Sequence, residues 1–208
     1  MIYLIRHAEV DKASPRRFLG RTDLPLNRNG ILQAQALHGQ LRHIPFSRVC
    51  TSSLQRAVQT AALVSGRQPE SLLLIEEFNE INLGDWEGLS VAEVESRFPG
   101  AYEQRGRDME HFRPHKGESF RDLADRCYPA LIRLAGTDPG PLLIIAHAGV
   151  NRVLLCRLQD RPLQQVMEIP QDYCGVTILR CSPERWTVEA VNLRGLPLVH
   201  ALQLKPCE

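Results

Sequence analysis

Short apolar runs alternate along the chain with longer segments in which apolar residues recur every three or four positions. The short runs, which are typical of buried strands, cover residues 2–5, 48–51, 71–75 and 141–146. The periodic segments, which are typical of amphipathic helices, cover residues 28–43, 54–66, 118–135 and 150–158. Thr51, Ser52 and Ser53 are candidate N-caps for the second of these helices. Because strands and helices take turns, the pattern predicts an α/β fold, a three-layer α/β/α sandwich with a mainly parallel central sheet.

The last part of the chain departs from this alternation. Residues 173–193 have the pattern of two strands around Ser182-Pro183-Glu184, which predicts a late antiparallel hairpin at the sheet edge. The length of 208 residues, of which 43% are hydrophobic and 24% charged, is enough for one globular domain with a sizeable core. We therefore expect a single domain spanning residues 1–208.

One internal segment, residues 90–116, fits neither the strand pattern nor the long-helix pattern. It opens with a short helical pattern over 90–98, in which Ser90 and Glu93 have the spacing of a capping box. The stretch that follows, residues 99–116, is charged and has no periodicity. We expect 90–116 to form a small helical lid or insertion over the sheet edge, within the single domain.

The charge balance and the cysteines limit the classes of partner and the compartment. The net charge is +1, from 25 basic and 24 acidic residues, so neither a nucleic acid nor an anionic membrane is favoured as a partner. The six cysteines form no C-x-x-C pair, which favours reduced, mostly buried thiols over three disulfides in a secreted protein. The N-terminal apolar run is too short for a signal peptide, and no run reaches the ~20 residues of a membrane span. We therefore expect a cytoplasmic location.

Two of the predicted strands end in histidine. The first strand ends in Arg6 and His7, and the strand at 141–146 is followed by His147. The other two lead to Arg56, in the first turn of a helix, and to an acidic segment that contains Glu80. Ligands of open α/β sheets bind at the carboxyl ends of strands, so neighbouring strands would bring these side chains into one pocket. Such a set can bind a phosphate dianion, attack phosphorus through an imidazole and protonate the departing oxygen.

The residue types alone leave other interpretations open. Arg6 and His7 could cap the strand and form surface pairs, and Arg56 could be an ordinary surface arginine. Histidines and acids could bind a metal, but the chain has no H-x-x-x-H or H-x-H spacing, so we expect no metal ion and no cofactor. The chemistry does not choose among the acids after the third strand, which are Glu76, Glu77, Glu80, Asp85 and Glu87.

Six short motifs follow one another along most of the chain. They are R-H-A-E at 6–9, G-x-x-D-x-P-L at 20–26, S-x-x-x-R-A-x-x-T-A at 52–61, F-x-E-x-x-x-G-x-W-E-G at 78–88, G-E-S at 117–119 and H-x-G at 147–149. Their content and order resemble the histidine phosphatase superfamily, in its phosphoglycerate mutase-like branch. The resemblance implies an enzyme, a phosphoric monoester hydrolase or a mutase.

The resemblance also implies a role for each matching position. His7 would be the nucleophile that becomes phosphohistidine, and Glu80 would be the general acid. The phosphoryl oxygens would be held by Arg6, Arg56 and His147. The further positions that the resemblance marks as substrate-binding are Gly20 and Ala148. In this way the resemblance selects one carboxylate where the chemistry left the choice open.

The chain departs from the family pattern at two positions. Ala8 stands where the family has the glycine of R-H-G-E, which adds a methyl group that is tolerable if φ stays negative. Ala13 stands where many members have an asparagine that contacts the phosphate. One donor is therefore missing, or it is replaced by Ser14, Arg16 or Arg17.

The short length and the motifs are similar to the subgroup of α-ribazole phosphatases and broad-specificity phosphatases. The resemblance implies hydrolysis of small phosphorylated metabolites, or of α-ribazole 5′-phosphate in cobalamin biosynthesis. The alternatives are a phosphoglycerate mutase and a non-catalytic phosphate-binding regulator. The expected partner is a small-molecule phosphate ester, and the expected state is a monomer or homodimer. The presence of both histidines, both arginines and Glu80 argues against the regulator.

Overall fold

The computed structural model describes residues 1–11, 13–137, 140–182, 185–195, 198 and 201. These residues form one six-stranded sheet of β1 (Ile2–Arg6), β2 (Arg48–Thr51), β3 (Leu73–Leu74), β4 (Leu142–Ala146), β5 (Val176–Cys181) and β6 (Trp186–Leu193). The strand order is β3-β2-β4-β1-β5-β6, and the first four strands are parallel. β5 runs antiparallel to β1, and β6 runs antiparallel to β5. The mainly parallel sheet with a late antiparallel hairpin is thus confirmed, while residues 183–184 between its strands lie outside the described residues.

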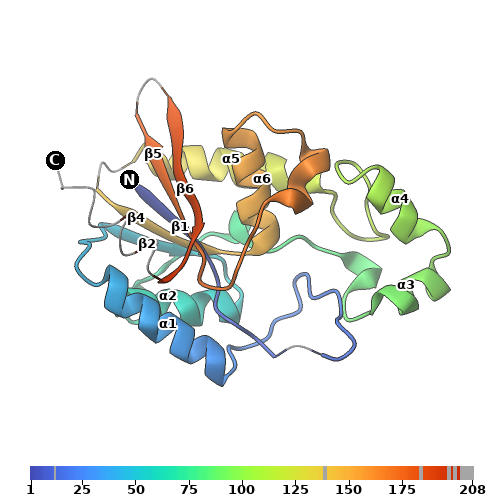
Figure 1. Cartoon of the computed structure of the whole chain (residues 1–208), viewed down its shortest axis with the longest axis horizontal. Coiled ribbons are helices and arrows are strands. Elements are labelled where there is room, and N and C mark those ends of the chain that lie inside the picture. Colours follow the sequence, from blue (N-terminus) through green and yellow to red (C-terminus); the bar gives the residue numbers. More distant parts are fainter. Residues whose placement is uncertain (12, 138–139, 183–184, 196–197, 199–200, 202–208) are drawn as a thin grey trace.

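Helices cover both faces of the sheet. The described α-helices are α1 (Arg28–Leu41), α2 (Gln55–Ser65), α3 (Val91–Arg97), α4 (Ala101–Arg107), α5 (Phe120–Ala135) and α6 (Ala148–Leu158). Four short 3-10 turns are also described, at Pro69–Ser71, Glu76–Phe78, Gly84–Trp86 and Leu163–Glu168. Figure 1 shows α1 and α2 together on one side of the sheet and α5 and α6 on the other.

The first strand explains why its sequence is apolar without interruption. Ile2 and Leu4 pack into the core beneath α5 and α6, whereas Tyr3 and Ile5 pack into the core beneath α1 and α2. Successive side chains of a strand point to opposite faces, so a strand covered on both faces must be apolar at every position. The three-layer sandwich predicted from the alternating pattern is confirmed.

The third predicted strand is shorter and more exposed than its sequence indicates. The pattern predicts residues 71–75, but a 3-10 turn occupies Pro69–Ser71 and only Leu73–Leu74 pair with β2. Leu73 and Leu74 are 44% and 55% exposed. β3 is the edge of the sheet, and an apolar run by itself does not distinguish an edge strand from a central one.

The segment 90–116 is helical over more of its length than its sequence predicts. α3 has the predicted capping box between Ser90 and Glu93. α4 lies within the stretch that has no periodicity, and none of its residues is buried, so it has no apolar stripe to reveal it. Tyr102 of α4 packs near Trp86, with ring centroids 6.3 Å apart. Figure 1 shows α3 and α4 projecting at one end of the molecule, away from the β5–β6 hairpin. Closure of this segment over a substrate stays a prediction.

The N-terminus of α2 is capped from a distance. Thr51, Ser52 and Ser53 are not its N-cap; that residue is Leu54, whose side chain makes no capping hydrogen bond. Instead, the backbone N–H of Gln55 donates to Asp23 Oδ1 at 2.8 Å. Asp23 belongs to the G-x-x-D-x-P-L motif, so this contact places the loop after β1 against the helix turn that carries Arg56.

Most of the described cysteines are buried free thiols. Among the described residues, four free cysteines are buried as predicted, and one is exposed, Cys181; Cys207 lies outside the described residues. No helix in the described ranges combines the length and the apolar character that crossing a membrane requires.

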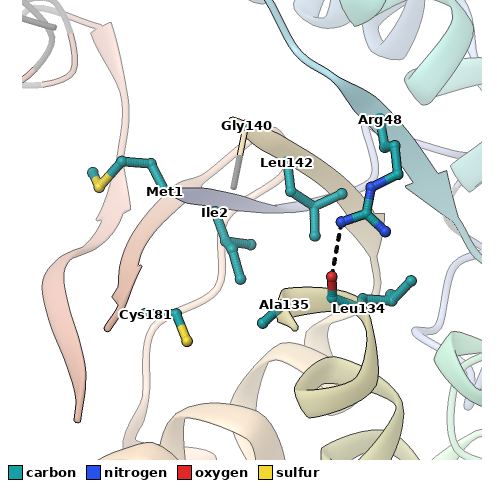
Figure 2. Close-up of a pocket in the computed structure, with 8 residues that line it drawn as sticks. All are labelled: Met1, Ile2, Arg48, Leu134, Ala135, Gly140, Leu142 and Cys181. Carbon is teal, nitrogen blue, oxygen red and sulfur yellow. Dashed lines mark hydrogen bonds between the residues drawn. The ribbon is translucent and has the colours of Figure 1, made fainter. Parts of the chain in front are cut away.

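A small pocket of about 60 Å³ lies at the amino ends of the parallel strands (Figure 2). Its lining includes the first residues of β1, β2 and β4, which are Ile2, Arg48 and Leu142, and Arg48 Nη2 donates to the Leu134 carbonyl oxygen at 2.8 Å. Ligands of such sheets bind at the opposite, carboxyl ends. This pocket is therefore separate from the residues that the motifs mark.

Candidate active site

The register of the sheet places the two motif histidines side by side. β1 and β4 are parallel neighbours, with Arg6 opposite Ala146, so the next residue of each strand leaves the sheet at the same level. The backbone N–H of His7 donates to the Ala146 carbonyl oxygen at 2.9 Å, and the His7 and His147 ring centroids are 5.1 Å apart. The neighbouring strands assumed in the sequence interpretation are thus present, and their carboxyl ends bring the imidazoles together.

His7 is held in one tautomer. Its side chain is buried, and Nδ1 lies 2.7 Å from the Ala8 carbonyl oxygen, which can only accept a hydrogen bond. Nδ1 therefore carries the proton, and Nε2 keeps its lone pair. Burial lowers the pKa of His7 well below its usual value, and the nearby positive charges of Arg56 and Arg6 lower it further. At neutral pH the ring is an uncharged imidazole with a nucleophilic Nε2.

Two arginines are fixed beside this imidazole by backbone carbonyls. Arg56 donates Nη1 to the Thr22 oxygen at 2.7 Å and Nη2 to the Gly20 oxygen at 2.8 Å. Arg6 donates Nη1 to the Gln171 oxygen at 2.6 Å. The Nε atoms of both arginines are buried and have no hydrogen-bond partner among the described residues. Guanidinium groups that are held by neutral carbonyls keep their charge available for an anion.

His147 is the N-cap residue of α6, and a serine holds its side chain. It is fully buried, and its Nε2 lies 2.6 Å from Ser52 Oγ, while Nδ1 has no partner among the described residues. Burial lowers the pKa of His147 well below its usual value, and the proximity of His7 and the positive charges of Arg56 and Arg6 act in the same direction. Ala148 follows as the half-buried first residue of α6. The site is therefore next to a helix N-terminus, where backbone N–H groups favour negative charge.

Glu80, in the acidic segment, contacts the first turn of α6. Its Oε2 accepts a hydrogen bond from the backbone N–H of Gly149 at 3.1 Å, and its Oε1 accepts from that of Ile81 at 3.0 Å. A Cβ atom at residue 149 would lie 2.4 Å from Glu80 Oε1, so the glycine of the H-x-G motif leaves the space that the carboxyl group occupies. This contact joins Glu80 to the helix that follows His147.

The remaining acids of that segment point elsewhere. Glu77 forms an ion pair with Arg133, and Asp85 forms one with His115. Glu87 accepts hydrogen bonds from the backbone N–H of Arg21 and from the Thr22 hydroxyl group. Glu76 is exposed. Of the five acids, Glu80 is therefore the one whose carboxyl group contacts the first turn of the helix that follows His147, and it is the one that the motif resemblance selects.

Gly20 is placed to hold Arg56. Its φ is +50°, and a Cβ atom there would lie 2.3 Å from Glu87 Oε1, so both the backbone conformation and the close approach require glycine. Its carbonyl oxygen accepts the hydrogen bond from Arg56 Nη2. A direct contact between Gly20 and substrate stays a prediction, as does one between Ala148 and substrate.

The two departures from the family pattern have different consequences. Ala8 is not among the described residues with positive φ, so its extra methyl group is accommodated without backbone strain. Around the position of Ala13, Arg17 is engaged with the Gly88 carbonyl oxygen and with Glu93 of α3. Burial lowers the pKa of Arg6, and the positive charge of Arg16 is among the groups that lower it further. Of the two loop arginines, Arg16 is therefore the one whose charge acts on the site.

Sequence reasoning missed several neighbours of the site. Tyr173 stacks on Arg6, whose Cζ lies 3.9 Å from the ring centroid, and its ring centroid is 5.6 Å from that of His7. Thr60 Oγ1 accepts a hydrogen bond from the backbone N–H of Ala8 at 3.0 Å. Thr60 and Ser52 both lie within the S-x-x-x-R-A-x-x-T-A motif, which was a usable signal, whereas no motif marks Tyr173.

Comparisons with known proteins agree with this arrangement. A family model described as the histidine phosphatase superfamily (branch 1) matches residues 2–194. The adenosylcobalamin/alpha-ribazole phosphatase of Salmonella typhimurium is 35% identical over 162 residues, which make up 77% of this chain and 80% of that protein. The glucosyl-3-phosphoglycerate phosphatase of Mycolicibacterium vanbaalenii is 30% identical over 171 residues, 78% of this chain and 75% of that protein. The crystal structure of the alpha-ribazole phosphatase from Shigella flexneri has a TM-score of 0.83 at 29% identity, covering 92% of this chain and 96% of that one.

Proposed function

The chain belongs to the histidine phosphatase superfamily (branch 1) and is a phosphoric monoester hydrolase, and we propose that it releases phosphate from small metabolites through a phosphohistidine on His7. The observation that carries this proposal is the neutral, tautomer-fixed imidazole of His7 beside the Arg6 and Arg56 guanidinium groups. A neutral Nε2 is a nucleophile, and two fixed cations stabilise the charge that develops on a transferring phosphoryl group.

The reaction would take place in two balanced steps. In the first, His7 Nε2 forms a bond to phosphorus, the bond from phosphorus to the leaving oxygen breaks, and Glu80 gives its proton to that oxygen. In the second, a water molecule loses a proton to Glu80 and attacks phosphorus, and the bond from phosphorus to Nε2 breaks. Arg6, Arg56 and His147 would hold the phosphoryl oxygens in both steps. The contact between Glu80 and the helix that follows His147 supports this assignment.

For the substrate, we propose α-ribazole 5′-phosphate within a broader range of small phosphate esters. Two relatives named above are called alpha-ribazole phosphatases, which supports this choice. A third is called a glucosyl-3-phosphoglycerate phosphatase, which supports activity on more than one kind of phosphate ester. The cytoplasmic location, a role in cobalamin biosynthesis and a monomeric or homodimeric state stay predictions.

The charges of the segment 90–116 favour a phosphatase over the alternative, a phosphoglycerate mutase. A mutase needs basic side chains that grip the substrate carboxylate while water is kept away. Here three arginines of that segment and its flank are already paired with acids, in the ion pairs Arg107–Glu103, Arg113–Asp122 and Arg121–Glu110, and a fourth, Arg105, lies over the Phe120 ring. Cations that are neutralised in this way offer little attraction to a carboxylate.

We expect phosphate release to exceed isomer exchange. With 3-phosphoglycerate as substrate, free phosphate should appear faster than 2-phosphoglycerate, because an open site admits water to the phosphoenzyme. The measurement is phosphate and both isomers quantified from the same mixture, with α-ribazole 5′-phosphate as a parallel substrate. If isomer exchange were much faster than phosphate release, the protein would instead be a phosphoglycerate mutase.

We expect no dependence on a metal ion. Arg6 and Arg56 supply the positive charge that a metal would otherwise supply to the phosphoryl group. Among the described residues, no three side chains of the histidine, cysteine, aspartate and glutamate types converge as ligands. Activity should survive dialysis against a chelator within about twofold, on the scale of ordinary assay differences. Loss with the chelator and recovery with zinc or magnesium would contradict the expectation.

A further inference from the structure

Two arginines from different elements hold the main chain of Glu80. Arg21, in the loop after β1, donates Nε to the Glu80 carbonyl oxygen at 3.1 Å. Arg126, on α5, donates Nη2 to the same oxygen at 3.1 Å and Nη1 to the Glu77 carbonyl oxygen at 2.5 Å. The position of the Glu80 backbone therefore depends on where these two guanidinium groups lie.

One carboxylate, that of Glu118, joins both arginines. Its Oε1 accepts from Arg21 Nη2 at 3.1 Å and from Arg126 Nε at 2.9 Å, and its Oε2 accepts from Arg126 Nη2 at 2.9 Å. The Oε2 atom also accepts from the backbone N–H of Asn82 at 2.9 Å. Burial raises the pKa of Glu118, but the hydrogen bonds from Arg126 and Asn82 outweigh burial and leave the pKa lowered. Glu118 is therefore a charged anchor for both guanidinium groups.

Among the described residues, the carboxyl group of Glu80 accepts hydrogen bonds from the backbone N–H groups of Gly149 and Ile81. Within the described ranges, neither Arg21 nor Arg126 bonds to that carboxyl group; both bond to the carbonyl oxygen instead. A carboxyl group paired directly with a guanidinium would be held as the carboxylate and would be a poor proton donor. Because Glu118 accepts from Nη2 of Arg21 and from Nε and Nη2 of Arg126, both arginines can fix the Glu80 backbone without capturing its side chain.

We propose that Glu118 is a positioning residue for Glu80, acting through Arg21 and Arg126. The carboxylate of Glu118 orients both guanidinium groups, which hold the Glu80 backbone so that its carboxyl group lies against Gly149 beside the histidine pair. This inference rests on the proposed function, in which Glu80 is the proton donor. A displacement of about 1 Å in a reacting group can cost roughly a hundredfold in rate. The cost here should fall on the step that needs the proton.

The test is Glu118→Gln, with Glu110→Gln as the matched control. Glu110 forms an ion pair with Arg121 of α5, so its replacement removes the same charge and an arginine contact without touching Glu80. For an alkyl phosphate, Glu118→Gln should lower kcat roughly 10- to 100-fold with little change in KM, because proton donation is impaired. For 4-nitrophenyl phosphate, whose leaving group needs no proton, kcat should stay within about threefold. The control should change neither. Equal losses on both substrates would overturn the inference.

Two further measurements keep the outcomes distinct. Arg21→Lys keeps the charge but cannot bridge the Glu80 oxygen and Glu118 with two nitrogens, so it should give the same dependence on the leaving group. Amide hydrogen exchange over residues 77–82 needs no turnover, and it should rise in Glu118→Gln and not in the control. If the wild-type protein released no phosphate, the proposed function would fail, and the exchange result alone would decide whether Glu118 positions this segment. Unchanged exchange would overturn the inference.

Discussion

Replacing His7 by glutamine should lower kcat/KM for every phosphate monoester by at least about a thousandfold, because the nucleophile is lost. Glutamine has a similar length and keeps a polar group beside Arg6, so the loss should not come from unfolding. The matched control is His38→Gln, because His38 bonds through Nδ1 to the carbonyl oxygen of Val64, which lies at the end of α2 opposite to Arg56. That control should keep near-normal turnover and a similar melting temperature.

The intermediate gives the same prediction a second readout. Wild-type protein mixed briefly with ³²P-labelled substrate should carry label that is stable to base and lost in acid, as a phosphorus–nitrogen bond requires, and His7→Gln should carry none. Burial and the charges of Arg56 and Arg6 keep the His7 pKa well below its usual value. The ring therefore stays neutral around pH 6.5, where an ordinary histidine becomes protonated. Protonation of His7 should not reduce kcat/KM in that range. Labelled His7→Gln, or turnover near that of the wild type, would refute the role of His7.

The second large effect is expected at Glu80. In Glu80→Gln, hydrolysis of an alkyl phosphate should fall by roughly 10²- to 10⁴-fold, since an alkoxide is a poor leaving group without a proton. Hydrolysis of 4-nitrophenyl phosphate should fall far less. Glu77→Gln is the matched control, because Glu77 lies three residues earlier and its carboxylate forms an ion pair with Arg133. Comparing kcat on the two substrates for both variants isolates proton donation.

Gly149→Ala tests the same role without changing a titratable group. A Cβ atom at this position would lie 2.4 Å from Glu80 Oε1, so the carboxyl group must move. The variant should therefore resemble Glu80→Gln, with a larger loss on the alkyl phosphate than on the aryl phosphate. If both Glu80→Gln and Gly149→Ala lost the same factor on both substrates, Glu80 would be a structural residue rather than an acid.

Much of the fold and of the site was predictable from local pattern. The uninterrupted apolar runs of β1 and β4 indicated strands covered on both faces, and a histidine follows each run at the edge where ligands bind. The motif at 52–61 marked Arg56. The same motif contains Ser52, but its contact with His147 could not be predicted from the sequence pattern. The edge strand β3 and the exposed helix α4 were harder to predict. Neither has a buried residue, so neither carries the pattern of apolar positions by which strands and helices are recognised.

The sequence by itself determined the strands, the helices on both faces and the identity of His7, Arg6, Arg56 and His147 as candidates, because each depends on residues close together along the chain. The tertiary structure decided how Glu80 meets the first turn of α6, why residue 149 is glycine and what holds the acid in place. Glu80 meets Gly149 across 69 positions and Arg126 across 46. Contacts over such separations depend on how the strands and loops are arranged in space, and no local periodicity or propensity encodes them.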